Sequence, residues 1–124
     1  MSKISEFLPE FIAEAQASPE AQGRTDLAEQ LAILELSRWT YDAEEDAMYL
    51  YLSGQAPLNI VEQNIIGIRH GESIKLDALE GWVVIDTDNF DRIRGIEVLW
   101  RQDVAEKLKG AMAPNNWMQS LALV

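Results

Sequence analysis

The hydrophobic repeat of this chain changes near residue 38, and this change constrains the fold more than any other feature. In the segment 4–15, apolar residues recur at intervals of three and four, which places them on one face of a helix. In the segment 47–52, Met48, Leu50 and Leu52 alternate with two tyrosines, which is the period of a β-strand. A helical segment followed by a strand-rich segment is typical of an α+β fold.

Short turn-forming segments divide the middle of the chain into strand-like runs. The turn signals lie at 42–46, 53–54, 70–72, 80–81 and 88–91. The segments 60–68 and 82–86 are rich in branched apolar residues, and 96–101 alternates again, so each is predicted to be a strand. Connections this short favour antiparallel hairpins, because a parallel crossover needs about a dozen residues or more. We predict an antiparallel meander of four or five strands, packed by two N-terminal helices and one C-terminal helix.

Proline and capping residues predict where the helices begin and end. Pro9 lacks a backbone N–H, so the first helix either begins near it or kinks there. The Ser-Pro-Glu sequence at 18–20 is a helix start with proline at the first position. A second helix is predicted to open at residue 25 or 26, with Asp26 and Glu29 at the spacing of a capping pair. The run 103–109 predicts the last helix.

The length of 124 residues allows one compact domain. We divide it into a helical extension at 2–37, a β-sheet core at 38–101, and a C-terminal helix with an apolar tail at 102–124. Hydrophobic residues at 48% and charged residues at 25% are typical of a globular protein. The chain has no cysteine, which excludes disulfides, thiolate metal sites and cysteine nucleophiles.

The net charge of −11 excludes more functions than it indicates. Nucleic acids and anionic lipids are both bound through Lys and Arg, so neither is an expected partner. An acidic surface fits a basic protein partner, or serves solubility alone. The N-terminus lacks the apolar core of a secretory signal, and no segment approaches the roughly 20 apolar residues that span a bilayer. We therefore expect a cytoplasmic protein.

Two segments together resemble a known bacterial family. The first has Tyr41-Asp42, an acidic turn and an alternating strand to residue 52; the second has the apolar strand 83–86 ending in aspartate, followed by Gly95-Ile-Glu-Val at 95–98. This pattern, over roughly residues 38–101, resembles the small bacterial family known as domain of unknown function 2283. The resemblance implies a small β-rich scaffold and no particular activity. This chain differs in its N-terminal helical extension and in the longer spacing between the two segments.

Two acidic turns are candidate functional sites. They contain Asp42, Glu44, Glu45 and Asp46 in the first turn and Asp86, Asp88 and Asp91 in the second. Clustered carboxylates can bind hard cations, but the second turn lacks the glycine and the later glutamate of a calcium loop. A glycosidase would need two carboxyls at a fixed separation across a cleft, which a small sheet does not obviously provide. We expect solvated turn residues that serve folding, and we assign no metal and no cofactor.

The remaining candidates for catalysis are isolated. His70, the only histidine, precedes Gly71 in a predicted turn, with no nucleophile or orienting group at a recognisable spacing. Arg92 and Arg94 alternate with Ile93 and are expected to balance nearby acids. Because no nucleophile, base and orienter occur together, we expect no enzyme and assign no catalytic residue.

The strand at 47–52 is apolar on both faces, so Tyr49 and Tyr51 must contact something. Helices of the same chain can cover one face and loops or the tail the other, or one face can be a partner surface, where tyrosine is enriched. The apolar tail at 117–124 raises the same question, because free termini are usually polar.

Three functions remain. The first is a non-enzymatic binding protein, such as an immunity protein or antitoxin, which blocks a basic nuclease-type toxin through the acidic turns and the two tyrosines. Small acidic bacterial proteins with an added helical part are often of this class, which is an analogy of kind. The second is a self-associating accessory domain that forms a homodimer. The third, a metal protein or hydrolase that uses the carboxylates, ranks last.

Overall fold

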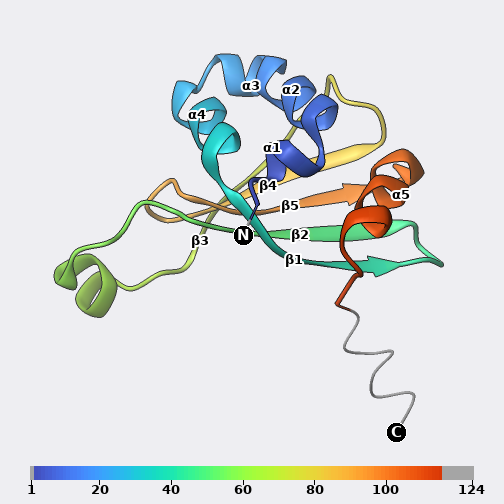
Figure 1. Ribbon diagram of the computed structural model, residues 1–124. Coiled ribbons are helices and arrows are strands. Elements are labelled where there is room, and N and C mark those ends of the chain that lie inside the picture. The colour runs from blue at the N-terminus through green and yellow to red at the C-terminus, as the bar shows by residue number, and fades with distance from the viewer. Residues whose placement is uncertain (1, 116–124) are drawn as a thin grey trace, which may run out of the picture.

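The computed structural model describes residues 2–115, which form one antiparallel sheet with helices on one of its faces (Figure 1). The helices are α1 (Ile4–Phe7), α2 (Pro9–Ala17), α3 (Pro19–Gln22), α4 (Thr25–Ile33), η1 (Glu62–Ile66) and α5 (Gln102–Ala111). The strands are β1 (Glu35–Asp42), β2 (Ala47–Ser53), β3 (His70–Lys75), β4 (Trp82–Asp88) and β5 (Ile93–Leu99). The predicted α+β class and the antiparallel pairing are confirmed.

Prolines split the N-terminal helical segment into more pieces than predicted. Pro9 and Pro19 each occupy the first position of a new helix, so four short helices replace the two expected. The cap at Ser18 is confirmed, since its hydroxyl accepts from the N–H of Ala21 at 3.3 Å and donates to the carbonyl of Ala15 at 2.6 Å. The capping pair predicted for α4 does not form, because Asp26 instead accepts from the side chain of Arg24.

The strand order is β1-β2-β5-β4-β3, so the sheet is not a single meander. The β1–β2 hairpin and the β3–β4–β5 meander join where β2 pairs with β5. The helical segment also ends earlier than predicted, because β1 begins at Glu35 and includes residues 35–37. The long connection between β2 and β3 permits this order, since it carries the chain from a strand beside the centre of the sheet to its far edge.

The connection between β2 and β3 contains a helix where the sequence predicted a strand. Its first turn is a capping box: the N–H of Glu62 donates to Oδ1 of Asn59 at 2.8 Å, and the N–H of Asn59 donates to Oε1 of Glu62 at 3.0 Å. Gly67, at a φ of 81°, ends the helix η1. The branched apolar residues of 60–68 therefore lie on a helical projection beside the sheet, drawn in green in Figure 1.

The segment 70–72, predicted as a turn, is the start of strand β3. Gly71 meets the neighbouring strand closely, because a Cβ there would lie 2.1 Å from the carbonyl oxygen of Asp88. The glycine thus permits a close approach of two backbones. In the sequence alone, a glycine of this kind cannot be told from one that forms a turn.

The core lies between the sheet and the helices. Met48, Leu50 and Leu52 of β2 point into it, whereas Tyr49 and Tyr51 lie on the opposite face. Trp39 of β1 is fully buried, and its indole Nε1 donates to the carbonyl of Met112 at 2.8 Å, which attaches the end of α5 to the sheet. None of the helices within residues 2–115 has the length and apolar composition needed to cross a bilayer.

Candidate functional site

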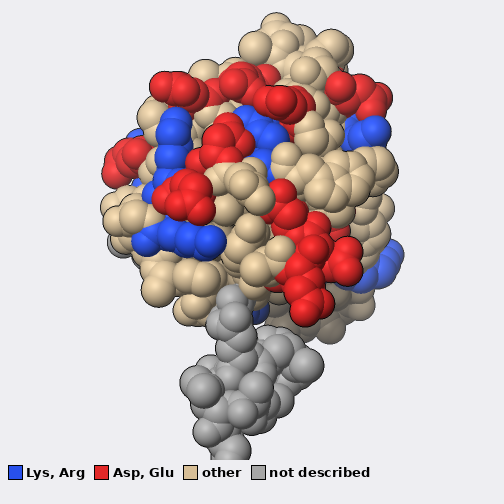
Figure 2. Space-filling view, turned by 90° about the vertical axis from the view of Figure 1, so that its right-hand side faces the viewer, with Lys and Arg blue, Asp and Glu red and all other residues tan. Residues whose placement is uncertain are grey.

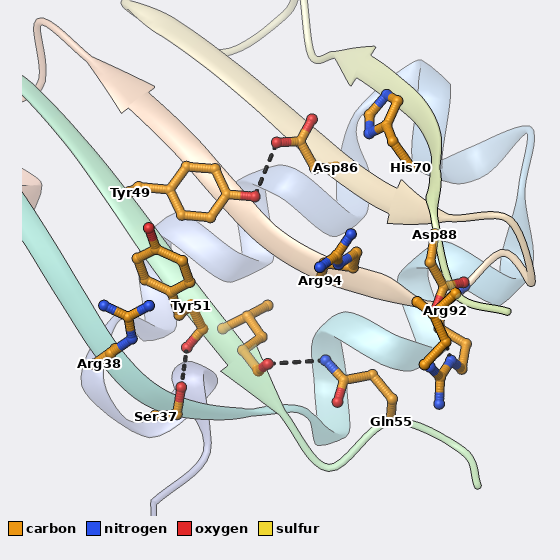
Figure 3. Close-up of a pocket in the computed structure, with 12 residues that line it drawn as sticks. Ser37, Arg38, Tyr49, Tyr51, Gln55, His70, Asp86, Asp88, Arg92 and Arg94 are labelled. Atoms are coloured by element: carbon orange, nitrogen blue, oxygen red, sulfur yellow. Dashed lines mark hydrogen bonds and ion pairs between the residues drawn. The ribbon is translucent and has the colours of Figure 1, made fainter. Parts of the chain in front are cut away.

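The face of the sheet opposite the helices, here called the open face, contains a shallow hollow of about 530 Å³ (Figure 3). All five strands, the turn between β4 and β5 and the segments on either side of η1 contribute to its lining. The lining residues are Ser37, Arg38, Tyr49, Tyr51, Leu52, Gln55, Ile68, His70, Asp86, Asp88, Arg92 and Arg94. Within residues 2–115 neither a helix nor a loop closes this face, and the tail, the remaining covering considered, lies outside the described residues. Tyr49 and Tyr51 are accordingly only half-buried.

A chain of hydrogen bonds crosses the open face from β2 to β3. The Tyr49 hydroxyl donates to Oδ2 of Asp86 at 2.8 Å, and the Ser73 hydroxyl donates to Oδ1 of the same carboxylate at 2.8 Å. His70 Nε2 lies 3.3 Å from the Ser73 hydroxyl. Burial, together with the bond to Asp86, raises the pKa of Tyr49 well above its usual value. Tyr49 is therefore a neutral donor at physiological pH, and Asp86 serves to position it.

This arrangement contains serine, histidine and aspartate, but not in the order that nucleophilic catalysis requires. In a catalytic triad the histidine lies between the serine and the carboxylate and takes the serine proton. Here Ser73 lies between His70 and Asp86, and its proton is directed to Asp86. Within residues 2–115, no group of three or more histidine and carboxylate side chains converges as a metal site either.

Gly95 makes this arrangement possible. It lies beside Tyr51 on one neighbouring strand and beside Asp86 on the other, and a Cβ at this position would lie 2.3 Å from Cε1 of Tyr49. The ring of Tyr49 thus packs across the bare backbone of β5. The register of β4 with β5 shifts at the same place, between the pairs Asp86–Gly95 and Thr87–Ile93, so Gly95 combines a β-bulge with a close approach of the Tyr49 ring.

The aspartates of the second acidic turn interact with other groups of the same protein. Asp88 is 1% exposed; its Oδ1 accepts from the backbone N–H groups of Phe90 and Arg92, and its Oδ2 accepts from Nε of Arg92 at 2.8 Å. Burial alone would raise the pKa of Asp88, but these hydrogen bonds outweigh it and lower the pKa below its ordinary value. The prediction that Arg92 balances a nearby acid is confirmed. Asp91 lies at a φ of 60° and forms an ion pair with Arg24 at 3.5 Å.

The first acidic turn lies at the other end of the sheet. Asp42 Oδ1 accepts from the N–H of Glu44 at 3.0 Å, and Asp46 Oδ1 accepts from the hydroxyl of Tyr41 at 3.0 Å. Glu44 and Glu45 are exposed. Ala47 pairs with Leu99 and Tyr51 with Gly95, so the two turns flank opposite ends of β2, about 20 Å apart. Together they do not form one acidic patch.

The acidic side chains of one side of the protein can be followed in a space-filling view. Figure 2 shows the side that carries α5, where carboxylates are scattered and interspersed with basic side chains. On this side of the protein the negative charge is therefore divided among several groups of carboxylates.

Sequence reasoning missed two features of the surface. The first is the set of exposed branched residues on the projection, namely Ile60, Val61, Ile65, Ile66 and Ile68. The capping box at 59–62 was the local signal for it. The second is the pair Arg38 and Arg94, which the strand order brings to the same hollow. Arg94 was expected to balance an acid, but it forms no ion pair with any carboxylate of the described residues.

Comparison with known proteins identifies no relative of this chain. A scan against protein-family models and searches of curated proteins and solved structures found no match. The resemblance to domain of unknown function 2283 stays a prediction. The apolar tail at 117–124, and with it the question of what the tail contacts, falls outside the described residues.

Proposed function

We propose that this protein is a non-enzymatic, cytoplasmic binding module whose partner is another protein, contacted through the projection at 60–68. The observation that carries the proposal is the exposure of branched aliphatic side chains there. Ile60 is 74% exposed and Ile65 is 76% exposed, with three further branched residues around them. A contiguous apolar patch of this kind on a folded surface marks an interaction site more often than chance exposure.

The base of the projection is held by specific hydrogen bonds. Arg92 donates to the carbonyl of Ala56 at 2.8 Å, and Asn89 donates through Nδ2 to the carbonyl of Gly67 at 3.1 Å. The N–H of Arg69 donates back to Oδ1 of Asn89 at 2.8 Å. An ordered base with an apolar tip supports presentation of that tip to a partner, because little conformational entropy is lost on binding.

The charge of the chain favours a basic partner. With 21 acidic against 10 basic residues, the protein attracts a cationic protein and repels nucleic acid. A nuclease-type toxin has such a cationic surface, so an immunity or antitoxin role is the specific form of the proposal. The exposed Glu44 and Glu45 serve in this view to steer the encounter.

Self-association is the second candidate, because the same apolar projection can pack against a second copy. Light scattering at several protein concentrations separates the two functions. A stable dimer that buries the projection favours the accessory-domain function, whereas a monomer removes it.

Ile65→Asp is expected to weaken partner binding by roughly tenfold or more, because a carboxylate placed in an apolar contact must be desolvated. Stability should not change, since Ile65 makes little contact within the chain. A photo-crosslinking residue at position 65, introduced in the native host, would identify the partner. The affinity of the purified partner for the wild type and the variant is then measured by calorimetry.

Ile33→Asp provides the matched control. Ile33 is 59% exposed on α4, and the substitution removes the same side chain and adds the same charge. Equal binding by the Ile65 variant and the wild type, or equal loss in both variants, would count against the projection as the contact surface.

A further inference from the structure

The hollow on the open face contains an excess of positive charge in an otherwise acidic protein. Three of the chain's ten basic residues, Arg38, Arg92 and Arg94, line it. Asp88 neutralises Arg92 at 2.8 Å. Arg38 and Arg94 are exposed and form no ion pair within residues 2–115. The only remaining carboxylate of the lining, Asp86, accepts hydrogen bonds from two hydroxyl groups, which stabilise its charge without a cation.

The aromatic floor of the hollow holds one of these arginines in place. The guanidinium carbon of Arg38 lies 3.8 Å from the centre of the Tyr51 ring, and the rings of Tyr51 and Tyr49 are 4.7 Å apart. A guanidinium that stacks through its face keeps its N–H groups free at the edge. Gly95 pairs with Tyr51, and the register shift of β5 beside Gly95 lets the neighbouring Arg94 line the same hollow (Figure 3).

We propose that this hollow binds a small organic anion, with its phosphate or carboxylate group between Arg38 and Arg94. Both oxyanions match the planar array of donors that arginine presents. The volume of about 530 Å³ lies in the range of small-molecule sites. His70 supplies a further polar group to the lining, whereas the side-chain donors of Ser37 and Gln55 are already bonded to backbone carbonyls. The net charge of −11 disfavours a nucleic acid or a membrane, since a long polyanion meets the surrounding acidic surface and a small anion does not. This site adjoins the proposed protein contact at 60–68, because Ile68 belongs to both, but Arg38 and Arg94 lie outside that segment.

The test uses three probes at constant ionic strength: inorganic phosphate, ribose 5-phosphate and citrate. Binding is followed by NMR on protein labelled with nitrogen-15, through the backbone amides and the arginine Nε–H groups. We expect at least one probe to shift the Nε–H signals of Arg38 and Arg94 and the amides of β2 and β5 in a saturable way. The two phosphate probes and citrate distinguish a phosphate from a carboxylate ligand.

The variants are Arg38→Gln and Arg94→Gln, and each is expected to lower the affinity roughly tenfold, the loss typical of one charged hydrogen bond. Lys107→Gln is the control, because Lys107 lies on α5, where it contacts Glu10 at 3.6 Å, and the charge change is the same. The absence of saturable shifts with all three probes overturns the proposal. An equal loss of affinity in the Lys107 variant also overturns it, because that result indicates general electrostatic attraction.

Discussion

Gly95→Ala is expected to destabilise the protein by about 3 kcal/mol, from overpacking and a lost hydrogen bond, and to lower its Tm by roughly 10 °C. The added Cβ would lie 2.3 Å from Cε1 of Tyr49 and 2.7 Å from the carbonyl oxygen of Leu50. Gly95 is in the central strand β5 and has a paired strand on each side, so the backbone has little room to yield. The Tyr49 ring must move, and its hydroxyl then loses Asp86. Thermal and urea unfolding followed by circular dichroism measure the effect.

Gly110→Ala is the matched control for this substitution. A Cβ at Gly110 meets nothing within 4 Å, and the residue lies in helix α5. The control is therefore expected to stabilise the protein by about 0.5–1 kcal/mol, the usual gain of alanine over glycine in a helix. If the Gly95 variant melts within about 1 °C of the wild type, the inference that Tyr49 packs closely on β5 is wrong.

A double variant separates the two contacts of Gly95. Tyr49→Ala removes the ring that the new Cβ would meet, whereas the carbonyl of Leu50 remains. The cost of Gly95→Ala is therefore expected to be smaller in the Tyr49→Ala background, with a non-additive difference of about 1 kcal/mol. Simple additivity would indicate that the strain comes from the backbone contact alone.

The fold class was predictable because it depends on local signals. The change of hydrophobic repeat predicted helices before strands, and Ser18 and Pro19 placed a helix start correctly. The strand order was not predictable in this way. It depends on the pairing of β2 with β5, whose partners Tyr51 and Gly95 are more than 40 positions apart in sequence. The projection was missed because branched residues favour a strand, whereas the capping box of Asn59 and Glu62 favours a helix.

The candidate site could be predicted only in part, because it also depends on contacts between residues that are distant in sequence. Tyr49, Asp86 and Gly95 were each singled out from the sequence, but their meeting depends on the register of three strands. The carboxylates considered as partner contacts divide by burial. The carboxylate of Asp88 accepts hydrogen bonds within its own turn and is not free to contact a partner. Exposed residues such as Glu44 and Glu45 remain available for such a contact. Burial of a turn aspartate is a tertiary property that turn composition does not encode.

Asp88→Asn is expected to destabilise the protein by about 3 kcal/mol at neutral pH, the typical cost of breaking a buried charged pair. Asn is the same size as Asp but has no charge. Its amide NH2 group would face the Nε–H of Arg92, so that two donors would meet without an acceptor. The β4–β5 turn and the base of the projection both depend on this contact, because the same arginine donates to the carbonyl of Ala56. Urea unfolding measures the loss. Asp77→Asn is the control, since the exposed side chain of Asp77 forms an ion pair with Lys75 at 3.2 Å, and no measurable change is expected.

The difference in stability between the wild type and Asp88→Asn is expected to shrink in acid. Hydrogen bonds hold the pKa of Asp88 in the folded protein below its ordinary value of 3.8, so the unfolded chain takes up the proton first as the pH falls. The stabilisation by the carboxylate is therefore present above pH 3.8 and is lost as the pH falls through the lower pKa of the folded state. Urea unfolding at a series of pH values from 7 to 3 tests this, because the two curves of unfolding free energy should converge only in the acid range. A constant separation over the whole series would mean that the charge of Asp88 does not stabilise the fold and that shape alone accounts for the cost of the substitution.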